Sequence, residues 1–94
     1  MPHSIRSYLL RYSDNELRAI LNMPNRVPEA YTLARKILKN RQALRSLYSV
    51  HQLNQMPTAD LKQALNALLE SDDLVGIEVI VRNILSILER REKQ

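Results

Sequence analysis

Apolar residues recur along this chain at the three- and four-residue intervals that are typical of amphipathic α-helices. The most apolar segment, about residues 73–91, is expected to form the last helix. One face of that helix carries a row of four isoleucines, Ile77, Ile80, Ile84 and Ile87. A second, overlapping row consists of Leu74, Val81, Leu85 and Leu88. Together the rows cover an arc of about 160°, against about 100° on an ordinary surface helix, so more than one neighbour is expected.

Capping residues predict where the other helices begin and end. Ser13 and Glu16 have the spacing of a capping box, in which each side chain bonds the backbone N–H of the other residue. Pro24 is expected to end this helix, and Pro28 suits the first turn of the next one. The expected caps of a short N-terminal helix, of the third main helix and of the last helix are Ser4, Thr58 and residues 71–73.

The helix that starts at Pro28 contains an irregularity. Its first apolar stripe includes Ala34 and Ile37, and a straight helix would place Arg41 on the same face. A charged side chain is not expected inside an apolar stripe. We therefore predict a break or kink near Asn40 and Arg41.

Residues 13–41 and 58–91 resemble each other, which suggests two copies of one structural unit. Setting Leu17 on Leu61 aligns the two starts, and residues 34–38 meet residues 81–85 after a shift of three. A duplication or a shared amphipathic pattern would both explain this, and each segment would form one helical hairpin. We predict an all-α fold: a single domain, residues 1–94, forming a small four- to five-helix bundle from two successive helical hairpins, about 13–54 and 58–91.

Composition narrows the class of protein further. The chain has no cysteine, which excludes disulfides, thiolate metal sites and cysteine nucleophiles. Its single glycine and four prolines argue against a turn-rich β-sandwich or barrel. No segment has the apolar length of a signal peptide or a membrane span, so a soluble cytoplasmic protein with no membrane partner is expected.

The basic residues are unevenly distributed. Between Arg26 and Ala59 the net charge is +5, whereas residues 60–94 have a net charge of −2. The predicted binding residues for nucleic acid or an acidic partner are Arg35, Lys39, Arg41 and Arg45. The alternative is a solvated helix face that also pairs with the acidic C-terminal half.

The sequence contains no recognisable catalytic motif. His3 and His51 are the only histidines, and neither belongs to a nucleophile motif. The acidic residues Glu70, Asp72 and Asp73 lack calcium-loop spacing and are better explained by helix capping. Gly76 is expected to mark a close approach by another helix or a weak first helical turn. No catalytic, cofactor-binding or metal-binding residue is predicted.

These patterns favour a non-enzymatic helical regulatory or adaptor module that acts by protein–protein interaction with a partner of unknown identity. The wide apolar arc of the last helix predicts a homodimer, with the isoleucine row as the self-association surface. The first alternative is a small nucleic-acid-binding protein that uses the region from Arg26 to Arg45. A further alternative is an inhibitor or immunity protein.

Overall fold

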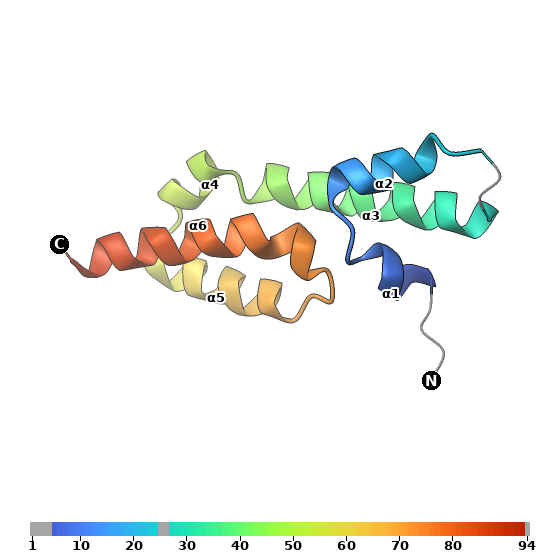
Figure 1. Cartoon of the computed structure of the whole chain (residues 1–94). Helices are drawn as coiled ribbons and strands as arrows, with labels where there is room; N and C mark the ends of the chain where they lie inside the picture. The colour runs from blue at the N-terminus through green and yellow to red at the C-terminus, as the bar shows by residue number, and fades with distance from the viewer. Residues whose placement is uncertain (1–4, 25–26, 94) are drawn as a thin grey trace.

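Six α-helices make up the secondary structure of residues 5–24 and 27–93, which are the residues that this computed structural model describes (Figure 1). They are α1 (Ile5–Leu9), α2 (Asp14–Leu21), α3 (Pro28–Leu47), α4 (Val50–Gln55), α5 (Thr58–Leu69) and α6 (Leu74–Glu92). Within these ranges there is no β-strand. The prediction of an all-α fold is confirmed.

Most of the predicted caps are present. The Ser13 hydroxyl accepts the Glu16 N–H at 3.2 Å, and the Ser13 N–H donates to the Glu16 carboxylate at 3.0 Å, which confirms the capping box. At the start of α6, the Asp73 carboxylate accepts the Gly76 N–H at 3.1 Å. Thr58 was wrongly predicted as a cap, because α5 begins at Thr58 itself and Pro57 precedes it without a side-chain bond. The predicted cap at Ser4 lies outside the described residues.

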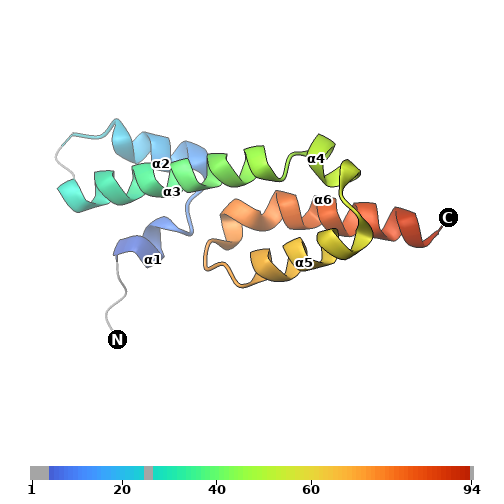
Figure 2. The ribbon, with the colours of Figure 1, turned by 180° about the vertical axis from the view of Figure 1, so that it is seen from behind.

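The helices form two lobes that lie end to end along α3 (Figures 1 and 2). We call α1, α2 and the first half of α3 the N-lobe, whose buried residues are Leu9, Leu10, Leu17, Ile20, Ala34 and Ile37. We call the end of α3 together with α4, α5 and α6 the C-lobe. Its buried residues are Leu53, Leu61, Ala64, Leu68, Ile77, Ile80, Ile84 and Ile87. The two hairpins thus keep separate cores, and α4 packs in the C-lobe through Leu53.

The molecule is long and thin as a result. It measures 55 × 30 × 16 Å and has a radius of gyration of 15.9 Å, whereas a compact chain of this length has about 12.4 Å. Equivalent positions of the two similar segments are nonetheless buried alike, as in the pairs Leu17 with Leu61 and Ile37 with Ile84. The alignment of the two segments therefore matches two hairpins with the same buried face.

The predicted kink in α3 is wrong, because α3 continues as one helix from Pro28 to Leu47. Arg41 does lie on the buried face, in register with Ala34 and Ile37. Arg41 can stay buried without a kink in the helix, because acidic groups from both lobes neutralise its charge. A charged residue in an apolar stripe here indicates a buried ion pair and not a helix break.

Candidate functional site

The structure does not bring the four predicted basic residues together. Successive residues of an α-helix are about 100° apart, so Lys39 and Arg41 point about 160° away from each other. Arg35 and Lys39 are exposed on the outer face of α3. Arg41 and Arg45 lie on the opposite side, where both bind Asp14. The prediction of one surface made by all four side chains is therefore corrected by the geometry.

Arg41 lies between the two cores, and 0% of its surface is exposed. Its guanidinium binds the Asp73 carboxylate through two bonds, from Nε at 2.9 Å and from Nη2 at 2.8 Å. Nη1 donates to Asp14 at 3.0 Å and to the carbonyl oxygen of Tyr12 at 2.8 Å. Nη2 also donates to the carbonyl oxygen of Leu10 at 3.2 Å. All five donors of the side chain are used, so Arg41 has none left for an external ligand.

Two features stabilise the ion cluster that Arg41 forms with Asp14 and Asp73. The pKa of Asp14 is lowered because its carboxylate accepts bonds from Arg45 and Arg41, although partial burial opposes the effect. Gly76 leaves room for the Arg41 side chain, since a Cβ at that position would lie 2.8 Å from Arg41 Cγ and would also clash with the Asp73 carboxylate. This confirms the expectation that Gly76 marks a close approach by another helix.

The exposed basic residues of α3 form a smaller group, Arg35, Lys36 and Lys39, which we call the basic face. These three side chains fall within an arc of about 100° on the outside of the helix. All are exposed, and none makes an ion pair with a described residue. Three neighbouring positive charges without partners suit an acidic or phosphate-bearing surface.

The isoleucine row of α6 is part of the C-lobe core. Ile77, Ile80, Ile84 and Ile87 are between 0% and 4% exposed. They pack with Leu61 and Leu68 of α5 in the same cluster. The folded chain therefore uses this row for its own hairpin, and it offers no surface there for a second copy.

The second row of α6 is the one that remains accessible. Leu74 is 66% exposed and Leu85 is 51% exposed, whereas Val81 and Leu88 are partly buried against the C-lobe core. Leu69, which is also exposed, ends α5 at the same end of the hairpin as Leu74. We call Leu69, Leu74, Val81, Leu85 and Leu88 the leucine face.

A shallow groove lies on another side of α6, between α6 and the segment that joins α3 to α4. It has a volume of about 310 Å³, and its apolar lining includes Tyr48, Val50, Val75 and Val79. Val79 is 62% exposed, and Arg45 stands at the edge of the groove. We call this feature the valine groove. It is an apolar surface flanked by a cation, with no acid–base pair in its lining.

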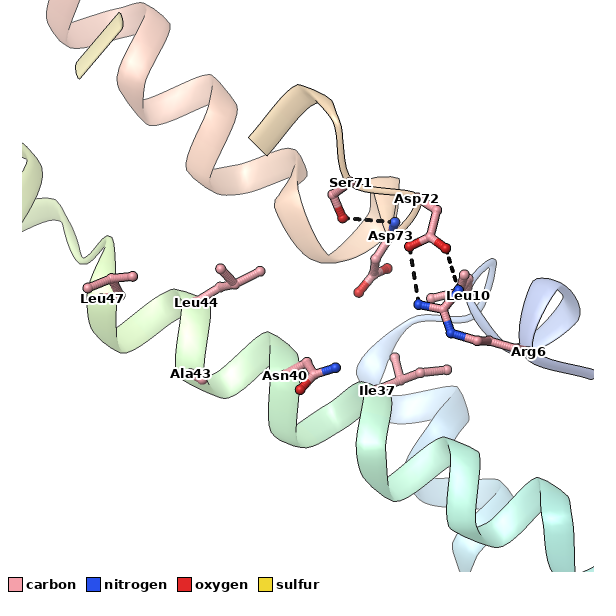
Figure 3. Close-up of a pocket in the computed structure, with 10 residues that line it drawn as sticks. All are labelled: Arg6, Leu10, Ile37, Asn40, Ala43, Leu44, Leu47, Ser71, Asp72 and Asp73. Atoms are coloured by element: carbon pink, nitrogen blue, oxygen red, sulfur yellow. Dashed lines mark hydrogen bonds and ion pairs between the residues drawn. The ribbon is translucent and has the colours of Figure 1, made fainter. Parts of the chain in front are cut away.

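A further pocket, of about 370 Å³, opens between α1, α3 and the loop before α6 (Figure 3). An ion pair between Arg6 and Asp72 closes one end, and it lowers the pKa of Asp72. The α3 side of the pocket is mostly apolar and includes Leu44 and Leu47, as Figure 3 shows. Both charged groups at its end are already paired with each other, so the pocket presents no free ionic group there.

The remaining candidates for chemistry do not assemble into a site. His51 is exposed and lies 3.2 Å from the Gln55 amide, one turn further along α4. His3 lies outside the described residues. Over residues 5–24 and 27–93, no three histidine, aspartate or glutamate side chains are grouped so that they could hold a metal ion.

Neither the helices nor known proteins identify a function for this chain. In the described part of the chain, none of the helices combines the length and the apolar character that crossing a membrane requires. Comparison with protein-family models, with curated proteins and with solved structures gives no match to this chain. Function must therefore be argued from the surfaces themselves.

Replacing Arg41 with leucine should lower the free energy of unfolding by about 3–5 kcal/mol, because Asp73 would be left buried without its cation. The matched control is Lys39→Leu, two residues away on the exposed side of α3, which should change stability by about 0.5 kcal/mol or less. Urea unfolding followed by circular dichroism measures both. Equal stability of the two variants would contradict the role given to Arg41.

The lowered pKa of Asp14 predicts a pH dependence of stability. A carboxyl group whose pKa is lower in the folded state than its unfolded value of about 3.9 stabilises the fold above that value, and the contribution is lost as pH falls through the folded pKa. Asp14→Asn should therefore be less stable than wild type at neutral pH, and the difference should shrink below about pH 4. A difference that stays constant from neutral to acidic pH would rule this out. Urea unfolding at a series of pH values provides the measurement.

Proposed function

We propose that this chain is a non-enzymatic helical module, with a regulatory or adaptor role, that acts by binding another protein through its C-lobe. One observation carries the proposal, namely that the apolar side chains left exposed are concentrated on this lobe. Seven of the exposed large apolar residues lie there, namely Leu47, Val50, Leu69, Leu74, Val75, Val79 and Leu85, whereas Tyr8, Tyr12, Met23 and Val27 are exposed elsewhere. Exposed apolar side chains gathered on one part of a molecule are typical of interaction sites on soluble proteins.

The valine groove is the part of this surface that best suits an amphipathic partner helix. One wall is α6, the other is the segment from the end of α3 to the start of α4, and the lining includes the partly buried Tyr48 and the buried Ile80. An apolar side chain from a partner would bury Val75 and Val79, which the chain itself leaves in water. Arg45 at the edge is already paired with Asp14, so the apolar anchor is what a partner would recognise here.

The groove can be tested with two adjacent substitutions on α6. Val79→Lys places a charge in the groove, and it should reduce capture of the partner from a lysate at least tenfold, which corresponds to about 1.4 kcal/mol. Glu78→Lys is the control, because Glu78 is exposed on the neighbouring part of the helix and does not line the groove. Quantitative mass spectrometry should find proteins that wild type and the control retain and the groove variant loses. Identical profiles for all three would refute the proposal.

The basic face favours a second candidate function, the binding of nucleic acid. Arg35, Lys36 and Lys39 project together from α3, away from the acidic groups that neutralise Arg41. This candidate is weaker than the sequence alone indicates, because Arg41 has no free donor and Arg45 is bound to Asp14 at 2.5 Å. Three cations would neutralise about three phosphates, which is a small electrostatic footprint.

Salt dependence tests this second candidate. If the basic face binds about three phosphates, raising the salt concentration from about 50 to about 200 mM should weaken oligonucleotide binding about 40-fold. The triple change of Arg35, Lys36 and Lys39 to glutamate should abolish binding and leave the helical signal unchanged. As a matched control, Arg82→Glu and Arg90→Glu alter exposed cations on α6. Fluorescence anisotropy that shows no wild-type binding at the lower salt would remove this candidate.

A further inference from the structure

We propose that the leucine face of α6 binds the leucine face of a second copy of this chain, forming a twofold symmetric dimer. This inference rests on the proposed function, because it treats the exposed apolar surface of the C-lobe as interaction surface. It adds the identity of one partner and the residues that recognise it. It also moves self-association from the isoleucine row to the neighbouring row of the same helix.

The chain's own helices leave part of this face in solvent, at Leu74 and Leu85. Gly76 faces Arg41 of α3, and Leu85 follows Gly76 by nine residues, which is half a turn beyond two full turns. Leu85 therefore points away from α3. Helix α5 contacts α6, and Val81 and Leu88 are only partly buried against the C-lobe core. The leucine face is thus partly buried along Val81 and Leu88 and exposed at Leu74 and Leu85. An external partner could bury the exposed part.

The spacing of the leucine face suits a copy of itself. Leu74 lies seven residues before Val81, and Leu88 lies seven residues after it. If two α6 helices pack antiparallel around a twofold axis near Val81, Leu74 of each copy meets Leu88 of the other. In a twofold interface each residue pair occurs twice, which requires a patch that is symmetric in this way. Heptad spacing on both sides of the axis is also what antiparallel helix packing needs.

The accessible surface of the chain is large enough for such an interface. It measures 6827 Å², whereas a compact monomer of 10.9 kDa exposes about 5,600 Å². The difference is about 1,200 Å², and a standard stable interface buries about 800 Å² on each partner. This excess is spread over the whole elongated chain, and it exceeds what one such interface would bury on one partner.

Sedimentation and cross-linking test the dimer directly. Wild type should sediment as a dimer, and the double variant Leu74→Lys, Leu85→Lys should sediment as a monomer with unchanged circular dichroism. Val75→Lys is the control, because Val75 is exposed on the groove side of α6, and it should remain a dimer. A monomeric wild type at high micromolar concentration, or a dimer that survives the double variant, would overturn the proposal.

A conservative second variant does not depend on the charged substitutions being tolerated. The natural chain has no cysteine, so Val81→Cys provides a single thiol at the expected twofold axis. Mild oxidation should join two chains through it, since a disulfide requires the two Cα atoms to lie within about 7 Å. Ser86→Cys, an exposed position on another side of α6, should form no disulfide between chains under the same conditions. Cross-linking of both variants to the same extent, or of neither, would count against the interface.

The outcome also separates this inference from the proposed function. If wild type is a monomer but loses a captured protein on Val79→Lys, the dimer is refuted and the adaptor proposal stands. If wild type is a dimer but captures no protein through the groove, the adaptor proposal is refuted and the dimer stands. If the leucine variants lose a different captured protein while wild type is monomeric, the leucine face serves that protein and the second copy is excluded.

Discussion

The fold depends on one buried cation. Arg41 comes from the helix that both lobes share, and its guanidinium binds groups from each of them: Asp14 and two carbonyl oxygens from the N-lobe side, and Asp73 from the start of α6. Within the described residues, every buried side-chain polar atom has a hydrogen-bond partner. Opening either lobe would leave a buried charge in the other without its partner, which is expensive in an apolar interior.

This constraint explains why the chain is elongated. The two cores contain only aliphatic side chains from separate sets of helices, and the ion cluster lies between them. If the hairpins packed face to face, their apolar faces would cover each other. In the end-to-end arrangement, α6 keeps an exposed row of leucines and a valine groove on its outer sides. The shape of the molecule thus creates the surfaces on which its proposed interactions rest.

Much of the fold could be predicted from local patterns, and the site could not. The Ser13 capping box, Pro28 in the first turn of α3, and the two apolar rows of α6 all depend on residues close in sequence. The fate of Arg41 depends on Asp73, which is 32 residues away. The position of Arg41 within an apolar stripe was the signal in the sequence that this side chain is buried. Its partners are Asp14 and Asp73, each at the start of a helix. Without their spatial arrangement, a helix break was the simpler interpretation.

The same limit applies to the surfaces. Sequence spacing showed that α6 has two apolar rows, but the packing of α3, α4 and α5 against α6 decides which row is buried. Sequence spacing also grouped four basic residues because they are close along the chain, although Lys39 and Arg41 lie on opposite sides of α3. Only Arg35 and Lys39 of the four remain on the outer face, where Lys36 joins them.

Native-state hydrogen exchange measured at increasing urea concentrations would test most directly whether Arg41 joins the two lobes into one cooperative unit. If Arg41 joins the lobes, core amides of α2, such as Leu17 and Ile20, and core amides of α6, such as Ile80 and Ile84, will open with the same free energy and the same dependence on urea. Two separate opening free energies, one for each lobe, would contradict it.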